Sequence, residues 1–143
     1  MFLFFLQAIV SWFLAGLIWM VQLVHYPSFR FYSSPTQTAH QFHQQRISLI
    51  VVPMMLIELT TAVALPIRDW PAFQSLHLAN LGLLAVIWLI TFLFMVPLHR
   101  QLLISSSDTV IQQLVRFNWI RTLAWTIKAI LWGGIIWHII SIS

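Results

Sequence analysis

Four long apolar stretches joined by short connections constrain this chain more than any other feature of its sequence. They cover Phe2–Val24, Ile47–Leu65, Leu76–Leu98 and Trp119–Ile140. At a helical rise of ~1.5 Å per residue, each is long enough to cross a hydrocarbon layer of about 30 Å. A bilayer offers backbone groups no hydrogen-bond partners, so such stretches form helices rather than open strands. The sequence therefore predicts an all-α integral membrane protein in which residues 1–143 form one four-helix up-down bundle.

The charged residues are few, and most of them lie in the predicted loops. Only 7% of residues are charged, against roughly 25% in soluble domains, so the bilayer is the expected surrounding. Five arginines flank the first and third loops and one lies in the second: Arg30, Arg46, Arg100, Arg116 and Arg121 against Arg68. This pattern explains the net charge of +4 without a nucleic-acid partner. By the positive-inside rule it predicts an inner (cytoplasmic) membrane protein with both termini outside the cytoplasm.

Two ionisable residues lie inside the predicted spans. Glu58 is in the second and Lys128 in the fourth, at similar depths counted along the helices. A charge near the bilayer centre costs ~3 kcal/mol or more, so such residues usually face the bundle interior and find a partner. We expect an ion pair between them. It either fixes only the helix register, or acts as a proton relay or a docking point for a charged substrate.

Each span carries a stripe of polar or large residues at helical spacing. The stripes are Gln7, Ser11, Ala15, Gln22 and His25; Met54, Glu58 and Thr61; His77, Asn80, Trp88, Thr91, Met95 and His99; Asn118, Arg121, Trp125, Lys128 and Trp132. Four such stripes predict a polar interior. For the neutral residues, the alternative is that they only bridge packed helices.

Four histidines reach the same predicted membrane face. His25 and His99 end odd-numbered spans, and His40 and His43 precede the second span. Imidazole suits zinc, copper and haem iron, so these four are candidate ligands of a transition metal or haem. The absence of cysteine excludes thiolate ligation and iron–sulfur clusters. The alternative is a set of interfacial histidines without a role, which is our expectation for His77 and His138 at the other face.

Residues near Lys128 suggest a site for an anionic or planar ligand. Arg121 with Asn118 suggests an anion site, because guanidinium offers a planar fork to carboxylate or phosphate. Arg46 and Arg121 are candidates to hold the propionates of a haem, and Trp125 and Trp132 to line a porphyrin or quinone. The alternatives are snorkelling of Arg121 to phospholipid and ordinary aromatic packing.

Several local signals predict where the helices begin and end. Ser34-Pro35-Thr36-Gln37 predicts the start of the second helix, and Thr109 with Gln112 that of the fourth. Leu65-Pro66 predicts the end of the second helix, and Pro53 predicts a bend beside Glu58. Tryptophans near the span ends are the expected interface anchors: Trp12, Trp70 and Trp137.

At these positions the chain resembles the four-helix membrane protoporphyrinogen oxidases of the HemJ type, and related copper-resistance-like and uncharacterised four-helix families. The matching segments are Ser11-Trp12-Phe13 with Gly16 and His25; Arg46 with Ile50 and Pro53-Met54; Leu76-His77; and Arg116-Phe117-Asn118. Where that family has its haem-ligating histidine this chain has Gln7, and in place of an essential lysine it has Ala79-Asn80. The resemblance therefore implies the architecture and a redox ancestry, but not protoporphyrinogen oxidation. His-Tyr-Pro at 25–27 and Asn-Trp-Ile-Arg-Thr at 118–122 resemble uncharacterised bacterial membrane proteins, which implies a bacterial source.

The sequence thus leads to three functional hypotheses. The first is a metal- or haem-binding membrane oxidoreductase with Glu58, Lys128 and Arg121 as catalytic candidates. The second is a small proton-coupled transporter or channel-like protein that uses the same buried pair. The third is an accessory subunit of a larger membrane complex or homo-oligomer.

Overall fold

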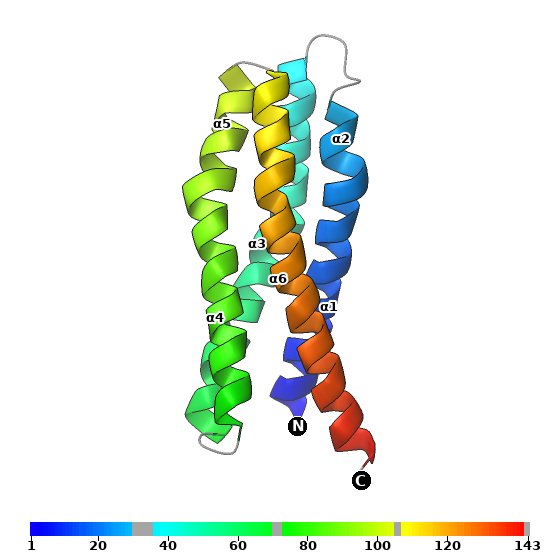
Figure 1. Ribbon diagram of the computed structural model, residues 1–143, viewed down its shortest axis with the longest axis vertical. Helices are drawn as coiled ribbons and strands as arrows, with labels where there is room; N and C mark the ends of the chain where they lie inside the picture. The colour runs from blue at the N-terminus through cyan, green and yellow to red at the C-terminus, as the bar shows by residue number, and fades with distance from the viewer. Residues whose placement is uncertain (30–35, 70–72, 105–106, 142–143) are drawn as a thin grey trace.

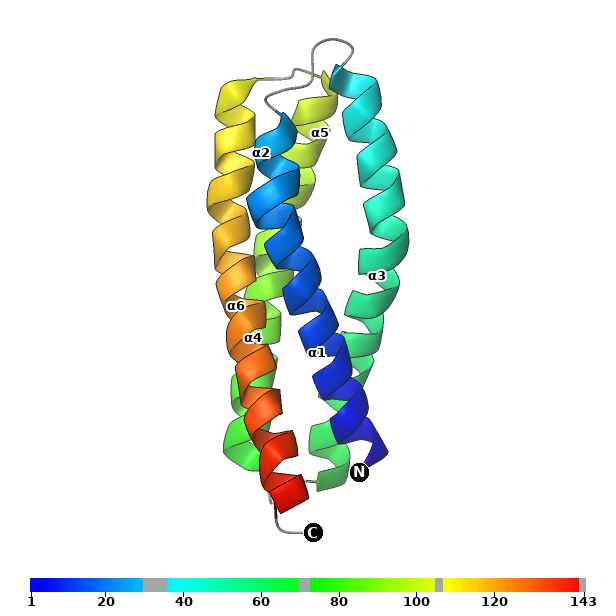
Figure 2. The same ribbon diagram turned by 90° about the vertical axis from the view of Figure 1, so that its right-hand side faces the viewer.

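The four predicted spans are four long helical rods, each long and apolar enough to cross a membrane. The computed structural model describes residues 1–29, 36–69, 73–104 and 107–141, without the side chains of 36–40 and 69. The rods are α1 (Phe2–Met20) with η1 (Val21–His25) and α2 (Tyr26–Ser28); α3 (Thr36–Asp69); α4 (Gln74–Ile90) with η3 (Thr91–Met95) and α5 (Val96–Ile104); and α6 (Asp108–Ser141). Consecutive rods run in opposite directions, so both termini lie at one end (Figures 1 and 2).

The helix boundaries correct two of the local predictions. Helix α6 begins at Asp108 rather than Thr109, because the Ser107 hydroxyl accepts a bond of 3.3 Å from the Thr109 backbone N–H and caps the helix. Helix α3 continues through Pro66 to Asp69. A proline in the last turn removes one backbone hydrogen bond, and here that loss does not end the helix. Helix α3 begins at Thr36, while the predicted cap at Ser34-Pro35 lies outside the described residues.

The first and third rods each contain a π-helical turn, η1 and η3. In both rods a proline follows the turn by two residues, at Pro27 and Pro97. A proline ring clashes with the carbonyl four residues earlier, which is Leu23 in η1 and Leu93 in η3. The wider turn accommodates that ring. π-helical turns are frequent at functional sites.

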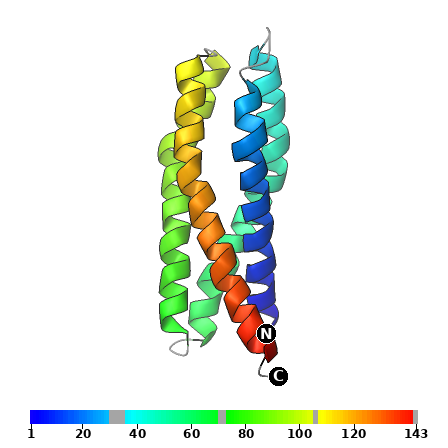
Figure 3. The ribbon, with the colours of Figure 1, turned by 45° about the vertical axis from the view of Figure 1, so that its right-hand side comes forward.

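Helix α6 runs diagonally across the bundle and packs closely on α1 (Figure 3). The Trp12 indole N–H donates a hydrogen bond of 2.7 Å to the Ala129 carbonyl, and its ring lies over Gly133, where a Cβ would stand 2.9 Å from the Trp12 ring. Trp12 thus joins α1 to α6 while 59% of its surface stays exposed, and its role as an interface anchor stays a prediction.

We expect Gly133→Ala to destabilise the fold by about 1 kcal/mol or more, because overpacking displaces the Trp12 ring from its bond to Ala129. Gly134→Ala is the matched control, since nothing lies within 4 Å of a Cβ there. It should be neutral or stabilising, because alanine favours helix over glycine by roughly 1 kcal/mol. Detergent unfolding of both variants tests this. Equal effects of the two substitutions would show that the Trp12 contact does not constrain position 133.

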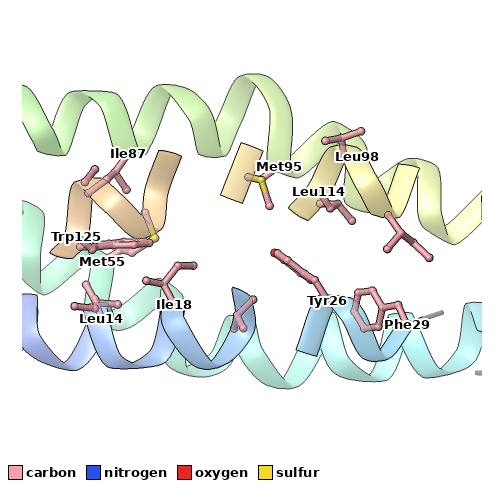
Figure 4. Packing of buried hydrophobic residues seen from close by; sticks show 14 of the residues in the cluster. Leu14, Ile18, Tyr26, Phe29, Met55, Ile87, Met95, Leu98, Leu114 and Trp125 are labelled. Atoms are coloured by element: carbon pink, nitrogen blue, oxygen red, sulfur yellow. The ribbon is translucent and has the colours of Figure 1, made fainter. Parts of the chain in front are cut away.

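Two apolar clusters fill the interior. The larger contains Leu14, Ile18, Tyr26, Met55 and Trp125 among others (Figure 4). The smaller, nearer the termini, contains Phe4, Ala8, Leu65 and Trp132. Buried polar side chains lie between and beside these clusters, and they form the candidate site.

Candidate functional site

Glu58 and Lys128 form the predicted ion pair. Helices α3 and α6 bring Glu58 Oε1 and Lys128 Nζ to 3.0 Å, and both side chains are 0% exposed. The pair lies in the middle of rods of membrane-spanning length, where nothing else in the described chain carries a full charge except Arg121. The prediction that these residues contact each other is confirmed.

The Glu58 carboxylate is held from several helices. The Ser11 hydroxyl of α1 donates to Oε1 over 3.3 Å, and the Trp125 indole N–H of α6 donates to Oε2 over 3.1 Å. Among the described residues, Lys128 Nζ contacts the Glu58 carboxylate and no other acceptor. The carboxylate is therefore better satisfied than the ammonium.

A neutral polar network continues from Ser11 toward the terminal end of the bundle. Gln7 Nε2 donates to the Ser11 hydroxyl over 3.4 Å, and the Thr61 hydroxyl donates to Gln7 Oε1. Gln7 is fully buried. It links α1 to α3 by hydrogen bonds, at the position where the predicted resemblance implies a haem-ligating histidine in the HemJ-type family.

Arg121 lies inside the bundle, on the inward face that its polar stripe predicts. Its side chain is 6% exposed. One guanidinium N–H donates to Asn118 Oδ1 over 3.2 Å, and the guanidinium carbon lies 5.0 Å from the Trp125 ring centroid. Asn118 in turn donates to Gln22 Oε1 over 2.7 Å. Trp125 therefore contacts both buried charges, Glu58 through its N–H and Arg121 through its ring.

Other predicted site residues take structural positions. Trp132 is fully buried, but its N–H donates to Asn80 Oδ1 over 3.1 Å and its ring packs edge-on against Phe4. These contacts are those of a packed core residue. His77 is fully buried on the inward stripe that the sequence predicts and lies at the start of α4, at the end of the bundle that holds the termini, whereas His138 is exposed.

Three of the predicted histidine ligands lie at one end of the bundle, where His25 stacks on His43 and His43 lines one cavity with His99. The His25 and His43 rings stack with centroids 3.3 Å apart and planes 27° apart. Their ring lone pairs lie in those planes, so the two do not point at one ion between them. His99 Nε2 lies 3.1 Å from the Tyr26 hydroxyl, and the side chain of His40 is outside the description. Within the described residues, no group of three potential ligands is placed to hold a metal.

A partly enclosed cavity lies among Tyr26, His43, His99 and Arg121, with a volume of about 170 Å³. Sites that bury drug-sized ligands measure roughly 300–1,000 Å³, so this cavity does not enclose a porphyrin. Arg46, the other predicted propionate partner, is exposed and lies 5.2 Å from the Phe42 ring. The described residues therefore do not fit the haem that the resemblance implies.

Sequence reasoning missed Tyr26, which is 3% exposed and points into the bundle (Figure 4). The available signal was the pair of prolines at 27 and 97, which mark the π turns on both sides of the cavity. No protein-family model matches this chain, and no curated protein or solved structure matches it either. The resemblance to the HemJ-type family therefore stays a prediction.

Proposed function

We propose that this protein is a multi-pass protein of the bacterial cytoplasmic membrane that couples the movement of a small solute to protons through Glu58 and Lys128. One observation carries the proposal. An acid and a base, both 0% exposed, contact each other at 3.0 Å in the interior of four helices of spanning length. Intramembrane ionisable residues commonly mark proton relays and solute pathways.

The surroundings of the pair suit a protonation switch. A proton on Glu58 neutralises the carboxylate, which weakens the ion pair between α3 and α6 and the accepted bonds from Ser11 and Trp125. Lys128 then loses its only contact of opposite charge among the described residues. Alternating access requires two packings of one bundle that differ by a small free energy, and protonation of Glu58 would shift the balance between them.

The redox hypothesis receives less support from the geometry. It requires a group of ligands placed around one ion, or a cavity beside the histidines that is large enough for a planar cofactor. The described residues form no such ligand group, and the cavity lined by His43 and His99 measures only about 170 Å³. The accessory-subunit hypothesis remains the alternative outcome of the transport experiment.

Proton flux in vesicles tests the proposal. Purified protein is reconstituted with a trapped pH-sensitive dye, and inward gradients of pyruvate, inorganic phosphate or glycine are imposed separately. We expect a solute-dependent pH change that Glu58→Gln abolishes. Asp108→Asn is the matched control, because it makes the same change at an exposed position and should retain the flux. Folded wild-type protein that moves no protons with any of these solutes would overturn the proposal, and co-purifying partners would then favour an accessory role.

The membrane orientation is a separate prediction. With Arg121 buried, four arginines near loops one and three (Arg30, Arg46, Arg100 and Arg116) still oppose Arg68 in loop two. The positive-inside rule then places both termini outside the cytoplasm. Fusions at Ser143 should activate a periplasmic reporter and leave a cytoplasmic one inactive. The opposite pattern would contradict this topology.

A further inference from the structure

The cavity beside Arg121 lies among all four rods. Its walls include Val21 and Tyr26 from the first rod, Val51 from α3, and Met95 from η3, together with Arg121 from α6. Both π turns contribute residues to this cavity, with Val21 from η1 and Met95 from η3. This location is one or two helical turns from the Glu58–Lys128 pair, since Arg121 and Lys128 are about 10 Å apart along α6.

Arg121 brings an uncompensated charge to this cavity. Its side chain is 6% exposed, and no carboxylate of the described residues pairs with it. Its Nε has no hydrogen-bond partner among those residues. A buried charge without an opposite charge is strongly unfavourable, and the Trp125 ring, the Asn118 amide and the Tyr26 hydroxyl carry no charge and compensate it only in part. An anion in the cavity would complete the compensation.

We infer that this cavity binds a small monocarboxylate with a short apolar tail. The Arg121 fork matches the two oxygens of a carboxylate, and the Tyr26 hydroxyl and the His99 ring lie on the same cavity wall. Ile18, Val21 and Met55 supply apolar surface for the tail. A cavity of about 150 Å³ holds benzene, so one of about 170 Å³ takes an anion of about six to eight non-hydrogen atoms.

A carboxylate fits the charges better than a phosphate does. Arg121 is the only permanently charged residue on the cavity wall, and one guanidinium balances one negative charge. Phosphate near neutral pH carries up to two charges on oxygens that need donors on every side, whereas much of this wall is apolar. If the protein is the transporter proposed above, this carboxylate is the transported solute. The binding site itself does not depend on that function.

Ligand-dependent stability of purified protein tests the site directly and requires no transport. The probes are butyrate, its neutral isostere butyramide, and inorganic phosphate, each at constant ionic strength. A ligand that binds only the folded state raises the melting temperature in a saturable way. We expect butyrate to do so, and butyramide and phosphate to have little effect. No saturable effect of butyrate, or a larger effect of phosphate, would overturn the carboxylate assignment.

Three variants locate the site. Arg121→Gln should weaken butyrate binding by about tenfold or more, since a paired charge is worth at least ~1.4 kcal/mol. Arg116→Gln is the matched control on an exposed face of the same helix and should bind like the wild type. Val51→Phe fills the cavity and keeps Arg121, so it should also block binding, which keeps the test decisive if Arg121→Gln fails to fold. Undiminished butyrate binding by folded Val51→Phe or Arg121→Gln protein would overturn the inference.

Discussion

Replacing either member of the Glu58–Lys128 pair alone is expected to destabilise the fold by about 3–5 kcal/mol, and replacing both by less than the sum. Each single substitution leaves a buried charge without its partner. The two should also differ. Lys128→Met leaves a carboxylate that still accepts bonds from Ser11 and Trp125, whereas Glu58→Gln leaves an ammonium with no other described partner. Glu58→Gln should therefore be the more destabilising change.

A double-mutant cycle measures this coupling. The free energy of unfolding is determined in detergent for the wild type, Glu58→Gln, Lys128→Met and the double variant. Asp108→Asn and Arg116→Gln serve as controls at exposed positions of α6, where changes usually stay within about 0.5 kcal/mol. Additive effects at 58 and 128 would mean that the pair contributes no interaction energy, and the proton-coupling proposal would lose its central observation.

The fold and the ion pair were predictable because the prediction assumed a bilayer, which offers no partners to free backbone groups or to isolated charges. Apolar stretches of this length must form helices, and Glu58 and Lys128 at similar depths must find each other or another partner. Helical spacing alone also predicted one inward face on the fourth helix, and all of its members are buried: Asn118, Arg121, Trp125, Lys128 and Trp132.

The sequence analysis was incomplete where the structure depends on the contacts of single side chains. Arg121 lies on its predicted inward stripe and is buried, but helical spacing does not record its contacts with Asn118 and the Trp125 ring. The stacking of His25 on His43 depends on side-chain conformations and on the π turn before Tyr26, and hydrophobic periodicity records neither of these.

Trp125 is a neutral side chain, and we expect its loss to weaken the support of both buried charges, Glu58 and Arg121. Trp125→Leu should destabilise the fold by about 3–5 kcal/mol, because it empties a fully packed position and removes the contacts to Glu58 and Arg121. Trp125→Phe should cost less. It keeps a ring beneath the Arg121 guanidinium and loses the indole N–H, whose bond to the carboxylate is worth roughly 1.5–3 kcal/mol.

Comparing these two variants separates the roles of the indole. Trp137→Phe on the same helix is the control, since Trp137 is 75% exposed and its replacement should have little effect. Trp125→Phe should lower the free energy of unfolding more than Trp137→Phe does. The difference measures the hydrogen bond to Glu58 together with the lost ring volume. The further cost of Trp125→Leu measures the aromatic support of Arg121, so only the leucine variant should also weaken butyrate binding. If Trp125→Phe and Trp137→Phe have the same free energy of unfolding, the indole N–H does not stabilise the Glu58 carboxylate. Trp125 would then not connect the ion pair to the cavity.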